Sequence, residues 1–361
     1  MSWRRLALVS AALVILVAVL LVGRTRTERD PSAASTIAST VTERGPGAAA
    51  PVRRSGGDSE QARGRDGGRV VVRGAWGAGQ GDFGRRSGEE QNAEGPMALA
   101  SGPGGEVIVL DQVNARAVRF GPDGAVRGSV ALGPDTAQDL AMSADGRIAV
   151  LDRVGAGQVL LHGPDGVLAG QVPVAGGPIA EAGGATGVFI DAHGVWVERE
   201  HGELVRVAGI DGTADPDRPT QPGRPTRDGL AFVHASLPSR TDGIAQLRLF
   251  DRDGQLLWQR SVAFGRSIVQ LLLLDSDRAG RVYLGAHLGR ESSEPPFMLV
   301  DQAIVIARYV AEGGVETGRL ALPATDAPEE VLRPLAVTDE GAILQLVPGD
   351  AGVEIVRYEF P

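Results

Sequence analysis

The sequence predicts an all-β protein, and three observations favour a six-bladed β-propeller as its main domain. The 361-residue chain contains 51 glycines but only 4% aromatic residues, a balance typical of many tight turns. A unit of four short apolar segments separated by turns recurs about every 40–50 residues, which is the period of a propeller blade. The last unit lacks its fourth strand and an unpartnered strand precedes the first unit, so a closed ring would place that strand in the last unit.

The repeat is clearest in residues 98–130 and 140–172. In each, an apolar strand and a glycine turn precede a β-branched strand that ends in Leu-Asp; a third strand, the tetrapeptide Gly-Pro-Asp-Gly and a fourth strand follow. Asp-Gly and Gly-Gly pairs between alternating apolar runs indicate hairpins, because these turns require residues that tolerate positive φ. Each unit is therefore predicted to be a four-stranded antiparallel sheet.

The turn glycines allow the blades to be counted. Turns between first and second strands are expected at Gly105, Gly146, Gly194, Gly229, Gly280 and Gly341. Turns between third and fourth strands are expected at Gly124, Gly166, Gly212, Gly254 and Gly314. The sixth blade runs out of chain before its fourth strand, so we expect a strand at residues 69–76 to complete it and to cover two open sheet edges. Residues 213–228 are proline-rich and fit strands poorly, so five blades with a long insertion remain an alternative.

Two segments carry a resemblance to a known family. Residues 145–152, Asp-Gly-Arg-Ile-Ala-Val-Leu-Asp, followed by Gly-Pro-Asp-Gly at 163–166, resemble the NHL-repeat family of six-bladed propellers. Residues 76–84, Trp-Gly-Ala-Gly-Gln-Gly-Asp-Phe-Gly, are similar to the lead-in of such a repeat. The resemblance implies the fold but little about function, since the family includes peptide-processing lyases, protein-binding modules and RNA binders. The family's Asn-x-Arg element is found as Asn114-Ala115-Arg116 and is lost in the second blade, so no complete family binding site carries over.

The N-terminus contains an apolar run at residues 6–22, in which Ser10 is the one polar residue. Its length lies at the lower limit for a membrane-spanning helix, and arginines follow where a signal peptidase would require small residues. We therefore expect residues 1–23 to be an uncleaved signal-anchor that forms a transmembrane helix, with a cleaved signal peptide as the alternative. Residues 24–68 are rich in Ser, Thr, Ala, Gly, Pro and Arg and are predicted to be a disordered linker to a propeller at residues 69–361.

Charge and composition indicate the location and exclude several classes of partner. The short head with Arg4 and Arg5 before a long soluble domain predicts a single-pass protein of the bacterial cytoplasmic membrane, with the propeller outside the cytoplasm. The chain lacks cysteine, which excludes disulfides, thiolate metal sites and a catalytic cysteine. Residues 70–361 contain 25 arginines and 39 acidic residues, a net charge of −14, so we expect no nucleic-acid partner.

The five histidines bear on whether the protein is a metal-dependent enzyme. No two have a spacing typical of a metal site, and the sequence contains no P-loop, nucleophile elbow or dinucleotide-binding fingerprint. A spatial cluster of His201, His234 and His287 is the alternative hypothesis, and it would make the protein a divalent-metal-dependent lyase or hydrolase acting at the propeller axis. Asp111 and Asp152 end second strands and are expected to accept hydrogen bonds from the following loops. We expect no cofactor and assign no catalytic residue.

The fifth blade contains the most informative irregularity. Its two turn glycines are 34 residues apart, compared with 18 to 25 in the other blades, so we expect an inserted loop near residues 289–302. An apolar loop on the face that carries the connections between second and third strands predicts a partner contact or a lid; the alternative is a plug over the axial channel. The candidate partner face comprises Asn114, Arg153, His201, Glu291, Glu294, Phe297 and Met298.

Together these features favour a membrane-tethered, extracytoplasmic binding or scaffold propeller over an enzyme. The expected partner is a protein, a peptide or a glycan, and the propeller is expected to be monomeric.

Overall fold

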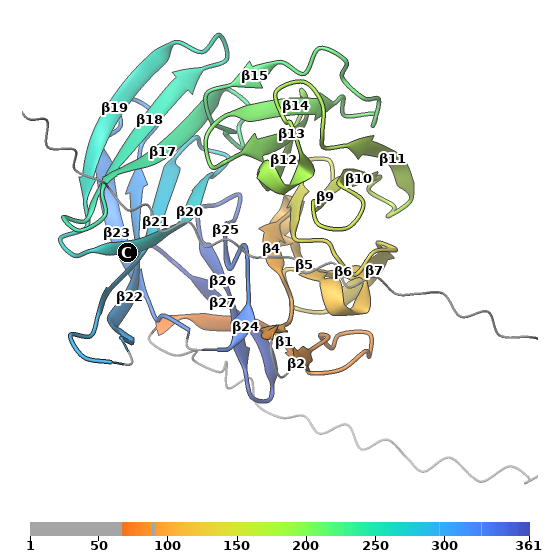
Figure 1. Cartoon of the computed structure of the whole chain (residues 1–361), viewed down its shortest axis with the longest axis horizontal. Helices are drawn as coiled ribbons and strands as arrows, with labels where there is room; N and C mark the ends of the chain where they lie inside the picture. Colours follow the sequence, from red (N-terminus) through yellow and green to blue (C-terminus); the bar gives the residue numbers. More distant parts are fainter. Residues whose placement is uncertain (1–66, 89–90, 296, 326) are drawn as a thin grey trace, which may run out of the picture. The chain divides into compact units, whose positions relative to one another are not determined.

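A computed structural model describes residues 67–361, with the exception of 89–90, 296 and 326. These residues form six four-stranded antiparallel sheets and one small three-stranded sheet, the architecture of a β-propeller (Figure 1). The expected signal-anchor at residues 1–23 and nearly all of the expected linker at 24–68 lie outside the described residues. Within the described part, no helix is long and apolar enough to cross a membrane.

Each large sheet runs from an innermost to an outermost strand. From the inside outward, the first sheet consists of β4 (Ala98–Ser101), β5 (Val107–Asp111), β6 (Arg116–Phe120) and β7 (Val126–Ala131). The second sheet consists of β8 (Asp139–Met142), β9 (Ile148–Asp152), β10 (Gln158–His162) and β11 (Leu168–Pro173). The third and fourth consist of β12 (Ala185–Asp191), β13 (Gly194–Arg199), β14 (Leu204–Ala208) and β15 (Thr220–Gln221), and of β16 (Arg224–Pro225), β17 (Ala231–Ser239), β18 (Ile244–Asp251) and β19 (Leu256–Ala263). The fifth and sixth consist of β20 (Ile268–Ser276), β21 (Val282–Glu291), β22 (Leu299–Tyr309) and β23 (Glu316–Leu322), and of β25 (Leu335–Val337), β26 (Ile343–Gly349), β27 (Gly352–Tyr358) and β1 (Arg69–Ala75).

The remaining elements are short. The small sheet consists of β2 (Arg86–Gly88), β3 (Gln91–Glu94) and β24 (Glu329–Glu330), and single 3₁₀ turns occur at η2 (Pro103–Gly105), η3 (Gln112–Asn114) and η4 (Ala182–Gly184).

The core lies between the sheets. Inner strands such as β5 and β9 are buried along their whole length, as their unbroken apolar sequences require, whereas outer strands such as β7 alternate between buried and exposed residues. Six clusters of buried apolar side chains join the sheets in cyclic order, from the first and second sheets around to the sixth and first. Hydrophobic packing between neighbouring sheets therefore closes on itself.

The strand predicted at residues 69–76 completes the last sheet. β1 pairs antiparallel with β27 from Arg69, opposite Arg357, to Ala75, opposite Gly352. Trp76 then donates its indole N–H to the Gly349 carbonyl at 2.9 Å. The prediction that this N-terminal strand completes the last sheet is confirmed.

The predicted turn glycines have the expected backbone conformation, since all eleven have positive φ. Gly124 has an additional constraint, because a Cβ atom there would lie 2.0 Å from the Val71 carbonyl oxygen in β1. The turn between β6 and β7 therefore packs against the closing strand at a distance that only glycine allows.

Gly124→Ala is accordingly expected to destabilise the protein more than Gly254→Ala. Gly254 has a similar φ of +80° and nothing within 4 Å of its missing Cβ, so its replacement introduces only left-handed backbone strain of about 1–2 kcal/mol. At Gly124 the collision with Val71 is expected to add about 1–3 kcal/mol, a typical cost of overpacking. Urea denaturation of the two variants measures this difference. Equal midpoints would show that the turn at Gly124 is not tightly packed against β1.

The proline-rich stretch at residues 213–228 contains two separate edge strands. β15 and β16 have two residues each and belong to different sheets, the outermost strand of the third and the innermost of the fourth. Both sheets therefore have four strands.

The strand directions define two ends of the propeller. The turns between first and second strands lie at one end, which we call the hairpin face. The connections between second and third strands lie at the other end, which we call the loop face. β1 begins at the hairpin face and ends at the loop face, since Arg69 pairs with the end of β27 and Ala75 with its start.

Candidate functional site

The residues of the predicted partner face all lie at the loop face. They are contributed by four connections between second and third strands, in the first, second, third and fifth sheets. These residues are Asn114, Arg153, His201, Glu291, Glu294, Phe297 and Met298.

Asn114 is engaged in structural hydrogen bonds. Its amide Nδ2 donates to the Gly77 carbonyl at 2.9 Å and to Asp111 Oδ2 at 2.8 Å. Arg116 donates to the same carboxylate at 2.8 Å and to the backbone carbonyls of Gly79 and Asp82. The Asn-x-Arg element therefore fastens the segment that follows β1 to the first sheet.

Arg153 connects neighbouring sheets. Its Nη1 donates to the Ala185 carbonyl at 2.8 Å, from the second sheet to the third. The preceding residue, Asp152, accepts the backbone N–H groups of Gly155 and Ala156 at 2.8 Å, as its position before a loop predicts. Asp111 instead accepts the Gly84 backbone N–H and the side chains of Asn114 and Arg116.

The three histidines of the alternative metal site do not form one. His287 Nε2 lies 2.9 Å from Gln302 Oε1 on the neighbouring strand, whereas His201 Nδ1 lies 3.7 Å from Glu198. His234 is half-buried beside Arg248, and burial lowers its pKa. Across the described residues, no group of three or more His, Cys, Asp or Glu side chains is placed to hold a metal ion. In this structure the described side chains of His201 and His287 have different neighbours, and they do not gather with His234 into one cluster.

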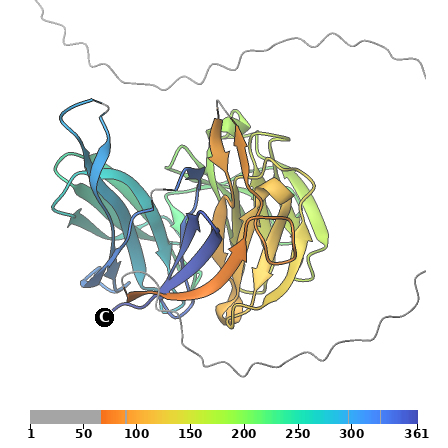
Figure 2. The same cartoon turned by 90° about the horizontal axis from the view of Figure 1, so that it is seen from below.

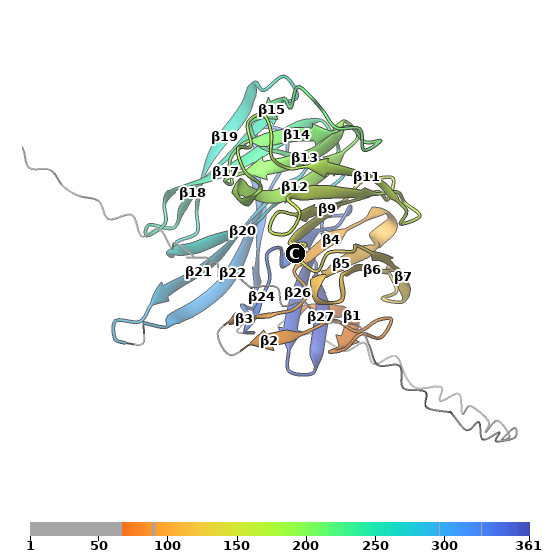
Figure 3. The ribbon, with the colours of Figure 1, turned by 45° about the vertical axis from the view of Figure 1, so that its right-hand side comes forward.

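The insertion in the fifth sheet has a different form from the one expected. The chain does not make a long loop: β21 and β22 both extend, and they remain paired from Val282, opposite Tyr309, as far as Glu291, opposite Leu299. We call residues 290–301 the arm. It projects beyond the neighbouring strands in Figures 2 and 3. An ion pair between Arg290 and Asp301, with a distance of 2.7 Å, joins its two sides at the base.

The arm presents two large apolar side chains to solvent. Phe297 is 61% exposed and Met298 is 60% exposed. Hydrogen bonds within the turn hold them there: the Ser292 backbone N–H donates to the Met298 carbonyl at 2.8 Å, and Ser292 Oγ accepts the Met298 N–H at 3.0 Å. A plug over the axial channel would bury these groups, so the plug alternative is wrong.

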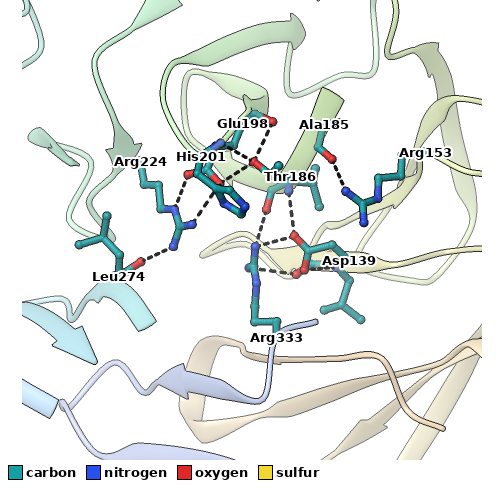
Figure 4. Close-up of polar contacts among 11 residues, drawn as sticks. Asp139, Arg153, Ala185, Thr186, Glu198, His201, Arg224, Leu274 and Arg333 are labelled. Atoms are coloured by element: carbon teal, nitrogen blue, oxygen red, sulfur yellow. Dashed lines mark hydrogen bonds and ion pairs between the residues drawn. The ribbon is translucent and has the colours of Figure 1, made fainter. Parts of the chain in front are cut away.

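A cavity of about 530 Å³ runs along the propeller axis, and of its polar residues the sequence analysis had named His201 but not Asp139, Arg224 or Arg333. Figure 4 shows the network near the loop face, in which side chains from four sheets meet. Arg333, just before β25, crosses to the second sheet and donates to Asp139 at 2.6 Å. Arg224, the first residue of β16, donates to both carboxylate oxygens of Glu198, at 2.8 and 3.1 Å.

The two carboxylates of this network respond differently to their surroundings. Burial raises the pKa of Asp139, and the Arg333 guanidinium opposes this effect only in part. Burial would also raise the pKa of Glu198, but the charge of Arg224, together with the nearby His201 and hydrogen bonds from Arg224 and Thr186, lowers it below its ordinary value. The surroundings of Glu198 therefore favour its ionised form.

His201 lies at the mouth of the cavity in a strained turn. The Gly202 N–H donates to the Arg199 carbonyl at 2.9 Å, and the two residues between them, Glu200 and His201, have φ of +51° and +57°. Such turns ordinarily contain Gly, Asn or Asp, because longer side chains are disfavoured at positive φ. The His201 backbone N–H donates to Thr186 Oγ1 at 2.9 Å, and its imidazole is 74% exposed.

One signal in the sequence could have indicated the axial network. Asp139 and Arg224 are the first residues of innermost strands, where the neighbouring residues are apolar or small. A charge at that position must find a partner inside the ring, since it is too far from solvent to remain alone. The partners Glu198 and Arg333 carry no such signal because they lie in different sheets, far away in the sequence.

The chain has distant structural relatives and no match among families. No protein-family model matches the sequence, and no curated protein is significantly similar to it. A hydrazine synthase from Kuenenia stuttgartiensis is similar in structure, with 12% identity and a TM-score of 0.47 over 72% of this chain and 80% of that one. A streptogramin B lyase has 11% identity and a TM-score of 0.40, covering 77% and 97% of the two chains. A gluconolactonase from Xanthomonas campestris has 14% identity and a TM-score of 0.42, covering 84% and 94%. Similarity at this level assigns neither an activity nor a ligand to this chain.

Proposed function

We propose that the protein is an extracytoplasmic binding or scaffold propeller, tethered to a bacterial cytoplasmic membrane by residues 6–22, whose arm recognises a protein partner. We further propose that its six large sheets are the blades of a monomeric, NHL-like propeller. The cyclic order of the six core clusters supports a ring completed by one chain.

The observation that carries this function is the exposure of Phe297 and Met298 at the end of a hydrogen-bonded arm. Large apolar groups held in water cost free energy that a partner can recover by covering them. Aromatic residues and Met are enriched at protein interfaces, where the flexible thioether adapts to irregular pockets. Glu291 and Glu294 precede the apolar pair on the arm and are exposed, so the arm combines apolar and charged groups, as protein interfaces do. A glycan or a short peptide would cover less of this surface.

Phe297→Ala is expected to weaken partner binding at least tenfold, with little change in stability. Loss of an aromatic anchor often costs about 2 kcal/mol or more of binding energy, whereas an exposed side chain contributes little to the core. The measurement is recovery of partners from an envelope extract on the immobilised variant and wild-type proteins, together with their thermal melting.

Leu257→Ala is the matched control for this experiment. Leu257 is also an exposed apolar residue, at 55%, but it lies on the outer strand β19 of the fourth sheet, away from the arm. It should leave recovery unchanged. An equal loss for both variants would mean that exposed apolar surface binds non-specifically, and a Phe297→Ala variant that melts far below wild type would contradict the exposed position of Phe297.

A further inference from the structure

The axial network has more hydrogen-bond donors than acceptors. A guanidinium has five N–H groups. For Arg224, three are engaged, two by Glu198 and one by the Leu274 carbonyl. For Arg333, three are engaged, by Asp139 and by the carbonyls of Val188 and Leu140. Each guanidinium therefore retains two N–H groups for which the described residues offer no acceptor.

The two carboxylates of the network each accept three hydrogen bonds from the protein. Asp139 accepts the backbone N–H groups of Leu140 and Val188, both at 2.9 Å, in addition to Arg333. Glu198 accepts Thr186 Oγ1 at 3.0 Å and both contacts from Arg224. A ligand acceptor group placed beside Arg224 and Arg333 would therefore meet N–H groups that the protein leaves unused.

Both guanidiniums contact the same aromatic ring. Their Cζ atoms lie 5.0 Å (Arg224) and 4.8 Å (Arg333) from the centre of the Phe189 ring. The contact fixes both groups, and their position inside the cavity removes much of the water that would screen a bound charge. His201, whose imidazole is exposed, also lines the cavity.

One wall of the cavity, which adjoins Arg224 through the Leu274 carbonyl, is apolar. Leu271, Leu272 and Leu274 of β20 line it and are half-buried. The volume of about 530 Å³ lies within the range of small-molecule sites. A ligand that fits both the guanidiniums and this wall has an anionic acceptor group and an apolar body.

We propose that the axial cavity binds a small organic carboxylate, whose oxygens accept the spare N–H groups of Arg224 and Arg333 and whose apolar body packs against the β20 leucines. Planar guanidiniums suit a carboxylate because two parallel N–H groups match its two oxygens. This site is separate from the arm and does not depend on the function proposed for it.

Isothermal titration of the full chain with hexanoate tests the proposal, with hexanamide as the uncharged analogue and inorganic phosphate as an anion without an apolar body. Hexanoate is expected to bind at least tenfold more tightly than either. Arg224→Met is expected to reduce hexanoate binding at least tenfold, whereas Leu257→Ala on the outer strand should not change it.

A measurement on the wild-type protein guards against a variant that fails to fold. Addition of hexanoate, but not of hexanamide, should shift the side-chain Nε–H resonances of Arg224 and Arg333 in nitrogen-15 NMR spectra, while those of exposed arginines such as Arg73 stay in place. Equal binding of hexanoate and hexanamide, or hexanoate shifts absent from both axial arginines, would overturn the proposal. Phosphate binding as tight as that of hexanoate would overturn the assignment of an organic carboxylate.

Discussion

A chain that begins at Gly84, and so lacks β1, is expected to lose more than about 5 kcal/mol of unfolding free energy, which is most of the stability of an ordinary domain. The deletion removes the fourth strand of the last sheet and the buried side chain of Val72. It also removes Phe83, which is completely buried and packs against Phe120 with a ring-centroid distance of 6.0 Å. Loss of one buried aromatic side chain alone typically costs about 3–5 kcal/mol.

The comparison is a chain that begins at Gly67 and retains β1. It should have the same urea midpoint as the full chain, because the described strands begin at Arg69. Phe83→Ala separates the two contributions, since it keeps β1 but removes the aromatic packing. If the chain that begins at Gly84 melted like the chain that begins at Gly67, β1 would not be required to close the ring.

Arg333→Met is expected to destabilise the protein by about 3–5 kcal/mol, because it leaves the Asp139 carboxylate buried without its counter-charge. The double variant Arg333→Met/Asp139→Leu is expected to recover most of this loss, since replacing both members of a buried ion pair by apolar residues is often neutral. Arg290→Met is the control, because the Arg290–Asp301 pair on the arm is exposed and such pairs contribute little. Chemical denaturation of the four proteins provides the comparison.

The loss in Arg333→Met should also depend on pH. The pKa of Asp139 is already raised in the folded protein by burial, and removal of the positive charge raises it further. A carboxyl whose folded pKa exceeds its unfolded value binds more protons when folded, so its contribution makes stability fall as the pH rises from the ordinary carboxyl range through the raised folded pKa. The destabilisation relative to wild type should therefore be smaller at acidic pH than at neutral pH. A destabilisation that grew on acidification would show that Asp139 is not the group left unpaired.

The ring architecture could be predicted from the sequence because the turn residues that define each four-stranded unit recur at a regular spacing. Gly124 and Gly166 occupy the same place in successive units, and each needs positive φ in a tight turn. The closing role of residues 69–76 followed from counting strands. A strand without a partner at one end of the repeats and a sheet with an open edge at the other end can pair with each other.

The axial network could not be predicted in this way. Arg333 meets Asp139 across 194 positions of sequence, and Arg224 meets Glu198 from a neighbouring sheet. The repeat determines which strands are innermost, but it does not specify which side chains cross the axis. The position of the arm could be predicted, because the spacing of the turn glycines in the fifth blade is longer than in the others. Its form could not be predicted, because only the pairing of β21 with β22 shows that it is a hairpin.

Arg69 lies opposite Arg357, so the chain enters the propeller beside the point where its last strand ends. A mechanical pull on the N-terminal side would therefore act first on this pair and then along the hydrogen bonds between β1 and β27, one after another, from the hairpin face. Tension applied there would open the seam of the ring before it reached the second to fifth sheets. The arm, in the fifth sheet and at the loop face, would lie outside that path of force.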